Sequence, residues 1–483
     1  MKETEILFIH ALAFLLAGCA VGPNFQRTEN ALGDVRLDAA DTAGHASRIS
    51  RGEKVPNAWW ALLGDPLLDS LEARAHEANL DLQSAYARID QSRASLGIVA
   101  AELLPALSAH ASYSRQALSA HGPMVALGAP SFAQNLWQTG LAALWELDLW
   151  GGNRRLREMA VARGLSKVYE KEVLHVALSA EVAKAYILLR GMQSQLDIAR
   201  TNERIAKEFV SLVETRRTNG VATRYESALA KSDLEQVSAL VVGYAHQCKL
   251  LMNGLASLLA QAPGSLDAEL GEHREVPALP PKAPVGLASE LARRRPDIRR
   301  AEENLHAATA SIGVAQANFY PSITLTGALG LQAFDRRDLG FWDSRWFAVG
   351  PSVSLPLFQG GRLVHELELK KAEQIEAALL YRKTVLTAWH EVDNALRLFT
   401  DEQKRTERLR LSFEESERAF AKLERSHREG EIAYLELLTG QRNVLAQRSS
   451  LHAARTQSVA ALVALYKAVG GGWDDERLIR DSD

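Results

Sequence analysis

Leu147–Arg154 reads LDLWGGNR, and Leu355–Arg362 reads LPLFQGGR. A run of alternating apolar and polar residues ends at each of these stretches, and a long run without proline begins there. Alternation is typical of a strand, and glycine supplies the backbone freedom that a sharp turn needs. The two stretches therefore indicate strand-to-helix turns in two copies of one structural unit.

Two further landmarks recur in the same order. Ala101–Pro105 (AELLP) opens the first alternating run, and Ala317–Pro321 (ANFYP) opens the second about 216 residues later. Glu214–Glu226 aligns with Glu424–Glu436 without a gap, with a glycine at the same place in both. Each copy is predicted to contain a helix, two strands joined by a loop, a long helix, a glycine turn and a second long helix.

The predicted strands cover about 105–117 and 136–150 in the first copy and about 319–332 and 346–358 in the second. In the first copy the odd positions of 141–149 are apolar, whereas Glu146 and Asp148 fall on the opposite face. A membrane β-barrel strand shows this pattern, but a half-buried soluble sheet would show it too. Five of the nine tryptophans lie at these strands or their ends, which favours the membrane: Trp137, Trp145, Trp150, Trp342 and Trp346.

Four strands are too few to close a membrane barrel. An open sheet edge in lipid leaves backbone groups unpaired at several kcal/mol each, and single-chain barrels begin at about eight strands. We therefore expect the barrel to be shared between several chains.

The segments after these strands are predicted to be long helices, because Arg154–Thr218 and Arg362–Arg428 contain no proline. About 65 helical residues would reach roughly 100 Å at about 1.5 Å per residue. Each helix is expected to turn back at a glycine, at about 218–222 and 428–432. Apolar residues at three- and four-residue spacing predict coiled-coil seams, formed by Leu234, Val237, Val241, Tyr244, Cys248, Leu251, Leu255 and Leu258, and by Val385, Trp389, Val392, Leu396 and Phe399.

The N-terminus has the pattern of a lipoprotein signal. Ile6–Ala17 is an apolar stretch of about twelve residues, which is shorter than the roughly 20 residues of a membrane-spanning helix and typical of a signal peptide. Leu16–Cys19 (LAGC) resembles a bacterial lipobox, in which the cysteine receives a lipid before cleavage. We therefore expect Cys19 to be lipidated, and Ala20 in place of the aspartate that retains lipoproteins in the inner membrane implies sorting to the outer membrane.

The composition and motifs argue against several other functions. The 483 residues carry a net charge of −3, and the 56 basic residues are spread along the chain, so no nucleic-acid partner is expected. The glycine turns lack the lysine of a phosphate loop, and the 13 histidines show no metal-ligand spacing. Glu146 and Asp148 could be read as a hydrolase pair, but alternate strand residues facing a lumen are ordinarily solvated. We expect no cofactor, no metal and no enzymatic activity.

On these residues the chain resembles the outer-membrane factor (TolC-like) family, and within it the NodT-type outer-membrane efflux lipoproteins. The resemblance covers nearly the whole length. The motifs that carry it are Cys19–Phe25, Trp59-Trp60 with Gly64–Leu68, Arg293–Ile298 with Ala301-Glu302, Ile312–Ala315 leading to Phe319–Pro321, and Gly350-Pro351 with Leu355–Phe358. Within Arg293–Ile298 we favour a structural role, because Pro296 can start a helix and Asp297 suits its first turn.

The resemblance implies a mainly α fold with a β-barrel portion. It implies a homotrimer, in which a twelve-stranded outer-membrane β-barrel with four strands per chain is joined to a long antiparallel coiled-coil helical barrel in the periplasm. The implied function is the exit duct of a tripartite efflux pump. The implied partners are a periplasmic adaptor protein and an inner-membrane transporter of the resistance-nodulation-division (RND) class. The barrel would also contact the lipid of the outer membrane. Two alternatives stay open: a channel for type I protein secretion, and a structural lipoprotein without a pore.

The predicted segments follow from the repeat and the resemblance. They are a signal peptide at 1–18, a lipidated extended segment at 19–65, the first repeat at 66–262, a proline-rich equatorial connector at 263–286, the second repeat at 287–469 and a C-terminal tail at 470–483. Five prolines between Pro263 and Pro284 argue against a helix in the connector.

The resemblance also implies two sites at the hairpin turns. The turn residues Gly220, Val221, Gly430 and Glu431 are expected to meet the adaptor, although the glycines could serve the turn alone. Glu226 and Glu436 match the aspartates of the family's periplasmic gate, and its second ring acid falls at Thr439. The family's locking arginine falls at Ile432, so that Arg224, Arg425 or Arg428 would have to replace it. Solvated surface glutamates are the alternative reading of Glu226 and Glu436.

Overall fold

The computed structural model describes residues 20–27, 49–51, 53, 55–286 and 295–473. The predicted signal peptide, Cys19 and most of the predicted C-terminal tail lie outside these residues. The chain divides into two compact units. The first unit contains Met1–Glu29, Arg88–Val168 and Arg300–Tyr381, and the second contains Asn30–Ala87, Tyr169–Arg299 and Arg382–Asp483.

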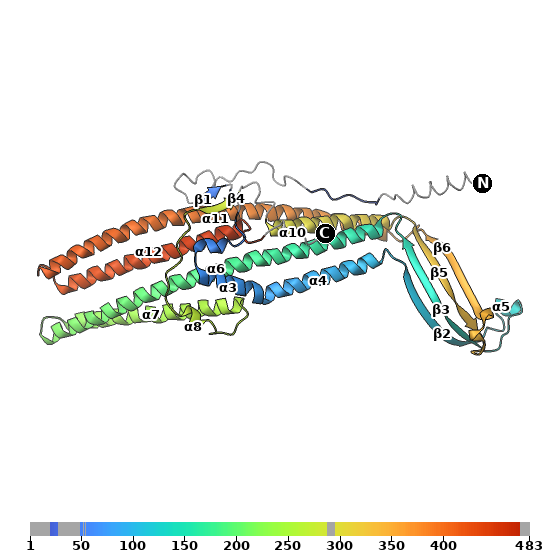
Figure 1. The fold of residues 1–483 in the computed structure, drawn as a ribbon, viewed down its shortest axis with the longest axis horizontal. Helices are drawn as coiled ribbons and strands as arrows, with labels where there is room; N and C mark the ends of the chain where they lie inside the picture. The colour runs from blue at the N-terminus through green and yellow to red at the C-terminus, as the bar shows by residue number, and fades with distance from the viewer. Residues whose placement is uncertain (1–19, 28–48, 52, 54, 287–294, 474–483) are drawn as a thin grey trace. The chain divides into compact units, whose positions relative to one another are not determined.

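A four-stranded antiparallel sheet forms one part of the first unit (Figure 1). Its strands are β2 (Ala106–Gln116), β3 (Gln134–Leu147), β5 (Ser322–Ala333) and β6 (Arg345–Ser354), in the order β2-β3-β5-β6. The connections hold the short elements α5 (Pro123–Ala126), η2 (Asp338–Gly340) and η3 (Trp342–Ser344). Because β3 pairs with β5, the sheet joins the hairpin of the first copy to that of the second.

Four helices lead into or out of the sheet, two in each copy. They are α4 (Leu80–Ala101) and α6 (Gly152–Thr218) in the first copy, and α10 (Pro296–Ala317) and α11 (Arg362–Arg428) in the second. Within the first unit, residues 20–27 lie against α6 and α10. A side chain at Gly22 would come within 2.5 Å of the Gly313 backbone, so this close approach depends on glycine at both positions.

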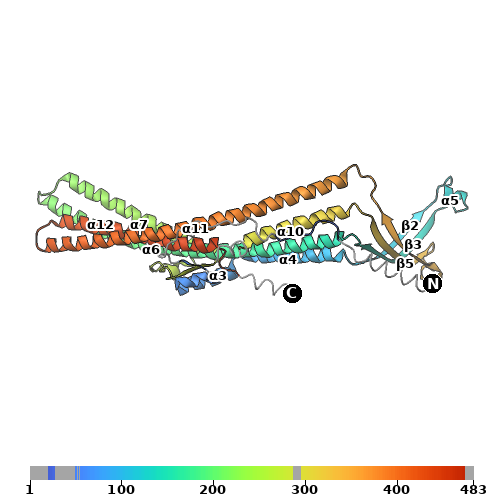
Figure 2. The same ribbon diagram turned by 90° about the horizontal axis from the view of Figure 1, so that it is seen from above.

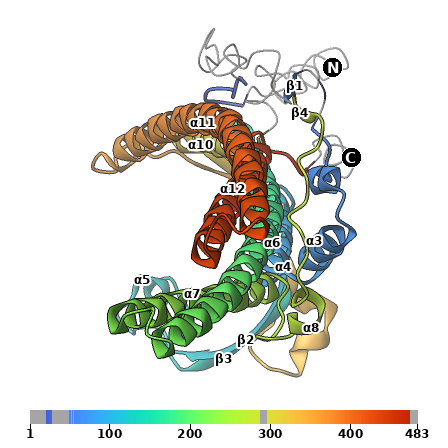
Figure 3. The same cartoon turned by 90° about the vertical axis from the view of Figure 1, so that its left-hand side faces the viewer.

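The second unit contains two helical hairpins, and Figures 2 and 3 show them from two directions. The later part of α6 turns back into α7 (Arg224–Leu258), and the later part of α11 turns back into α12 (Tyr434–Ala468). The remaining elements are η1 (Trp59–Leu63), α3 (Pro66–Ala78), α8 (Asp267–Leu270) and the parallel pair β1 (Ile49–Arg51) and β4 (Ala283–Gly286). Among the described residues no helix is both long enough and apolar enough to span a membrane.

The hydrophobic core of the second unit joins the hairpins to η1 and α3. Trp59 is 1% exposed and stacks on Tyr466 of α12 with ring centroids 5.1 Å apart. Several predicted seam residues are buried, among them Val237, Cys248, Leu255, Val392 and Phe399. Hydrogen bonds add to this packing, because Gln195 of α6 and Ser449 of α12 exchange bonds of 2.5 and 2.8 Å.

Three boundaries differ from the expected ones. The extended segment 19–65 is interrupted by η1, whose tryptophan is drawn into the core. The connector 263–286 contains one helical turn, α8, because 13 residues without proline separate Pro263 from Pro277. Strand β3 ends at Leu147 and not at 150, since Asp148 accepts hydrogen bonds of 3.0 Å from the backbone N–H groups of Asn153 and Arg154 at the start of α6.

Candidate functional site

One face of the four-stranded sheet is apolar across all four strands. The register places Leu107, Ala143, Gly327 and Val349 side by side, and Leu141, Leu329 and Phe347 lie in the next row of the same face. These side chains are not buried: Leu329 is 61% exposed, Phe347 82% and Val349 81%. An exposed apolar surface of this extent would make a soluble protein prone to aggregate, so it indicates a surface that faces lipid or a partner.

The opposite face of the sheet is largely polar. Ser108, His110 and Ser112 lie on this face of β2, Thr324 and Thr326 on that of β5, and Ser352 and Ser354 on that of β6. This alternation is what a barrel strand between lipid and a water-filled lumen shows. The outer edges of β2 and β6 have no strand partner within the described residues.

Tryptophans at the end of the sheet combine apolar rings with satisfied N–H groups. The indole of Trp145 donates to the Leu103 carbonyl at 3.0 Å, and that of Trp150 donates to the Pro321 carbonyl at 2.8 Å. Trp150 also stacks on Tyr320, with ring centroids 4.8 Å apart. Aromatic side chains with one polar contact are typical of the boundary between apolar and aqueous surroundings.

The turn between α6 and α7 closes through glycine. Gly220 has φ +75°, a left-handed conformation that costs little only at glycine. The backbone N–H of Val221 donates to the Arg216 carbonyl at 2.8 Å, which satisfies the end of α6. Val221 and Tyr225 are 66% and 74% exposed, so this turn presents apolar side chains to the solvent.

Glu226 closes a capping box at the start of α7. Its carboxylate accepts from the backbone N–H of Thr223 at 2.6 Å, and the Thr223 hydroxyl accepts from the Glu226 N–H at 3.2 Å. These bonds with Thr223, foremost the one from its backbone N–H, lower the pKa of the Glu226 carboxyl, so it stays charged at neutral pH. The sequence analysis missed this local role, although the Thr-x-x-Glu pattern of residues 223–226 is its usual signal.

The turn between α11 and α12 repeats the glycine but not the cap. Gly430 has φ +80°, and the Glu431 N–H donates to the Ser426 carbonyl at 2.9 Å. Ala433 takes the place of the capping threonine, so no side chain caps α12. Glu436 is therefore exposed without this local contact, and the hydroxyl of Thr439 donates back to the Leu435 carbonyl at 2.9 Å.

The two hairpins are joined near these turns by an ion pair that the sequence analysis also missed. Arg442 of α12 meets Asp233 of α7 through two contacts, of 2.7 and 2.9 Å. The two residues are far apart in the sequence. In the internal repeat, Asp233 corresponds to Asn443 and Arg442 corresponds to Ser232, so neither charge is repeated and no sequence pattern pointed to the pair. Of the arginines that the sequence suggested as a lock, Arg428 donates to the Glu424 carbonyl of its own helix, at 3.4 Å.

A groove of about 470 Å³ lies beside this ion pair. Its apolar lining includes Phe209, Leu212, Leu229 and Leu435, and its polar lining includes Arg216, Glu226, Asp233 and Arg442. Leu229 is 58% exposed and Leu435 is 38% exposed. The groove could therefore receive an apolar side chain from a partner while charged groups surround it.

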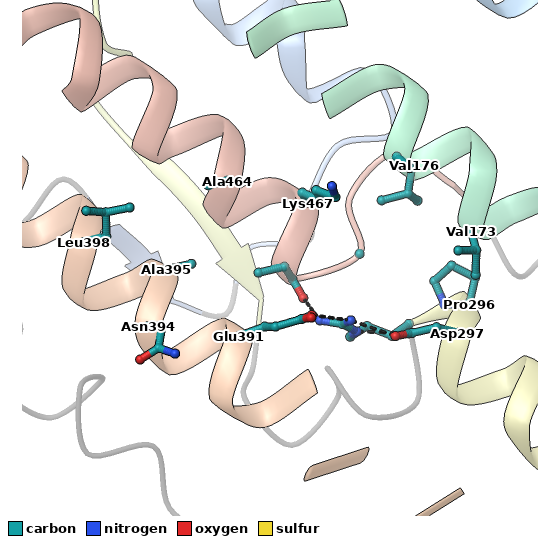
Figure 4. Close-up of a pocket in the computed structure, with 14 residues that line it drawn as sticks. Val173, Val176, Pro296, Asp297, Glu391, Asn394, Ala395, Leu398, Ala464 and Lys467 are labelled. Atoms are coloured by element: carbon teal, nitrogen blue, oxygen red, sulfur yellow. Dashed lines mark hydrogen bonds and ion pairs between the residues drawn. The ribbon is translucent and has the colours of Figure 1, made fainter. Parts of the chain in front are cut away.

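A second pocket, of about 510 Å³, contains the arginine of the Arg-Pro-Asp motif (Figure 4). Arg295 is 8% exposed and bonds Asp297 at 2.7 Å, Glu391 at 2.6 Å and the Ala468 carbonyl at 2.7 Å. Arg295 thus ties the start of α10 to α11 and to the end of α12. This supports the structural reading of the motif, because the guanidinium holds three helix segments together.

The residues that follow Cys19 are held by a buried arginine. Arg155 of α6 is 5% exposed, and its guanidinium donates to the carbonyls of Val21 and Gly22 and, at 2.6 Å, to the Asn24 side chain. Its other contact is Glu158, at 2.7 Å. Residues 21–24 are thereby fixed beside the strand-to-helix turn, because the Val21 N–H also donates to the Trp150 carbonyl at 3.0 Å.

No set of metal-ligating side chains is present in the part of the chain that the structure describes. What the described residues offer is a two-faced sheet, two glycine turns with exposed apolar side chains, and one ion pair between hairpins.

The sequence and the structure were compared with those of known proteins. Residues 71–261 and 287–471 match the family model described as outer membrane efflux protein. The pyoverdine export outer membrane protein OpmQ of Pseudomonas aeruginosa is 32% identical over 425 residues, which are 87% of this chain and 88% of that protein. Nodulation protein T of Rhizobium leguminosarum bv. trifolii is 27% identical over 462 residues, 96% of each chain.

A solved structure of the outer-membrane channel OprN is 32% identical, with a TM-score of 0.85, and the match covers 94% of this chain and 100% of that one. The fold class expected from the sequence is thereby confirmed, since this outer-membrane channel shares the fold over nearly the whole of both chains. The family model covers most of the chain, and the sheet, the helical hairpins and their turns lie within the matched residues, so the chain belongs to the outer membrane efflux protein family.

Proposed function

We propose that this chain forms the outer-membrane exit channel of a tripartite efflux pump, and that three copies build one pore. The observation that carries the proposal is the sheet, which has one exposed apolar face, one polar face and two open edges at β2 and β6. Three such sheets would supply twelve strands and pair every edge, which satisfies the backbone in lipid. The polar faces would then line a wide lumen that conducts solutes without chemistry.

The partners follow from this role. A channel in the outer membrane has no energy source of its own, so a periplasmic adaptor and an inner-membrane transporter must deliver the substrate. We propose a transporter of the RND class, in keeping with the lipoprotein branch that the chain resembles. Protein secretion is the second candidate, and no contact of the described residues favours it.

The lipid anchor is proposed at Cys19, outside the described residues. The contacts of Arg155 with residues 21–24 support it, because they hold the start of the mature chain beside the aromatic end of the sheet. A lipid on the preceding cysteine would then enter the membrane close to the barrel. The barrel would hold itself in the bilayer, so one lipidated cysteine per subunit would be a supplementary attachment.

Docking of the adaptor is proposed at the two glycine turns. Exposed Val221 and Tyr225 offer apolar contact at the first turn, and the groove beside Leu229 and Leu435 extends this surface between the hairpins. Gly430 and Glu431 would present the second turn in the same way.

We propose that the gate lies at the end of the hairpins where the two glycine turns are. Three copies would bring together six carboxylates from Glu226 and Glu436, and clustered like charges attract cations. Since the charged Glu226 carboxylate is already occupied by hydrogen bonds from Thr223, Glu436 should be freer to interact with cations. The Asp233–Arg442 pair would act as the lock, because the hairpins can separate only if it breaks.

The first prediction tests the pore. Val349→Arg should reduce folded trimer in the outer membrane, because an arginine in the middle of a lipid-facing strand costs about 2–4 kcal/mol. Ser352→Arg, on the polar face of the same strand, should leave the amount of trimer unchanged. The readout is trimer on semi-native gels together with efflux of a fluorescent substrate. Equal tolerance of both variants would show that the Val349 face does not meet lipid.

The second prediction concerns the lipid. Cys19→Ala should abolish incorporation of labelled palmitate and leave the precursor uncleaved. Cys248→Ala is the matched control and should label like wild type, since Cys248 is a buried side chain of α7. Label retained in Cys19→Ala would refute the anchor and leave the channel assignment untouched.

The third prediction concerns docking. Tyr225→Glu and Val221→Glu should lower crosslinking to the adaptor and efflux at least about tenfold, because a charge replaces an apolar contact worth about 1.5–3 kcal/mol. Gln247→Glu adds the same charge to an exposed position of α7 far from the turn and should have no effect. Trimer yield must stay constant throughout. Normal crosslinking of both turn variants would exclude this surface.

The fourth prediction concerns the gate and is read in planar bilayers. Asp233→Asn should raise the single-channel conductance by opening the lock, and the charge exchange Asp233→Arg with Arg442→Asp should restore the low value. The double variant Glu226→Gln, Glu436→Gln should weaken cation selectivity and block by multivalent cations. Glutamine keeps the capping geometry at position 226, so unchanged selectivity would count against the gate charges and not against folding.

A further inference from the structure

Helix α3 packs on α6 (Figure 1) through apolar residues. A cluster of titratable side chains, which the proposed transport does not use, lies at the same contact. Glu72 of α3 is fully buried, and neither of its carboxyl oxygens has a hydrogen-bond partner among the described residues. Its Oε2 lies 3.5 Å from Nε2 of His76, one helical turn later. Burial of an unpaired carboxylate would be very costly, so this group is stable here only in its protonated form.

Two histidine rings meet at the same contact. The ring centroids of His76 and His175 are 4.1 Å apart, and Nε2 of His76 lies 2.9 Å from the hydroxyl of Ser179. The Ser179 hydroxyl also lies 3.2 Å from the His175 carbonyl, so it can accept from His76 while donating to α6. Two imidazolium ions at this separation would repel each other, and the contact therefore requires neutral rings.

The other charged groups facing the cluster come from both helices. On α3, Asp69 acts on Glu72 and helps to raise its pKa, whereas the Ser179 hydroxyl of α6 acts in the opposite direction. On α6, Lys171 lowers the pKa of His175, and Glu172 pairs with Lys171 and lies 3.9 Å from Nδ1 of His175. The backbone of Gly472, after α12, raises the pKa of His175 and so favours its protonated form.

We propose that Glu72, His76 and His175 form a proton-sensitive latch that holds α3 on α6. The latch is closed when the carboxyl group is protonated and both rings are neutral. Opening exposes the three groups to water, where each returns to its ordinary protonation state. The inference concerns the docking of α3 alone and stands whether or not the chain conducts efflux substrates.

The sign of the pH dependence differs between the acid and the histidines. Burial lowers the pKa of His76 and of His175 to about 4, from 6.5, so opening takes up a proton at each ring as pH falls below 6.5. The histidines therefore favour docking above pH 6.5 and lose this contribution as pH falls toward 4. Burial raises the pKa of Glu72 to about 9, from 4.5, so opening releases a proton between these values. The acid favours docking below pH 4.5 and loses this contribution as pH rises toward 9.

Together the two contributions give the docking of α3 an optimum pH. Between pH 4.5 and 6.5 opening takes up about two protons and releases about one, so docking weakens about tenfold per pH unit as pH falls. Between pH 6.5 and 9 opening only releases the Glu72 proton, so docking weakens about tenfold per unit as pH rises. The protection of α3 should therefore be greatest near pH 6.5.

Hydrogen exchange of the full-length trimer tests the latch. The readout is the protection of peptides from Pro66–Ala78 between pH 5 and 8.5, corrected for the intrinsic pH dependence of exchange. Glu72→Gln keeps the shape of the protonated acid, so it should remove the alkaline decline and steepen the acid decline to about a hundredfold per unit. His76→Gln with His175→Gln should reverse the acid decline, so that protection rises toward acid.

His246→Gln, an exposed histidine of α7, is the control and should keep the wild-type optimum. If the double histidine variant does not fold, His175→Gln alone can be used. In that variant opening takes up one proton and releases one, so the protection of α3 should hardly change with pH below 6.5. A wild-type protection that shows no optimum, or a histidine variant that loses protection toward acid as the wild type does, would overturn the proposal.

Discussion

The architecture depends on one constraint, the need of backbone N–H and C=O groups for partners where water is absent. The sheet of this chain has four strands, and its outer strands β2 and β6 have no further partner among the described residues. A surface with Phe347 and Val349 more than 80% exposed suits lipid, but in lipid the free edges would be unsatisfied. Pairing of these edges with the edges of further copies would satisfy the free backbone groups. The trimer is therefore a condition for the sheet to be stable in the membrane, and the pore is the space that it encloses.

The internal repeat gives the two helical hairpins similar turns, but the residues that cap the helices after the turns differ. Both turns use a glycine with positive φ, at Gly220 and Gly430, because the chain must reverse in a few residues. The caps that follow differ, with Thr223 in one copy and Ala433 in the other. A carboxylate that caps its own helix is less free to act on ions in a pore. The two copies thus share a scaffold while their charges can serve different purposes.

The parts of the fold that repeat locally could be predicted from the sequence. Alternation in the strands, the absence of proline in 154–218 and 362–428, and the glycine turns are short-range patterns, and the four strands and two hairpins follow from them. Contacts between distant residues could not be predicted, because no pattern links Asp233 to Arg442 or His76 to His175. The capping role of Glu226 is a different case. Its signal, the Thr-x-x-Glu pattern of residues 223–226, is present in the sequence.

Long helices leave one problem that apolar periodicity cannot solve. Two helices with a regular apolar seam can slip by one turn, about 5.4 Å, and still bury similar surface. Buried polar contacts remove this freedom, since each is satisfied in one register only.

In the second unit Arg190 is fully buried and donates to Gln193 at 2.7 Å and to the Glu272 carbonyl at 2.9 Å, which fixes α6 against the connector. Arg295 does the same for α11 and α12. Because the hairpin turns lie many residues from these contacts, their positions relative to one another depend on the register that the buried polar groups select.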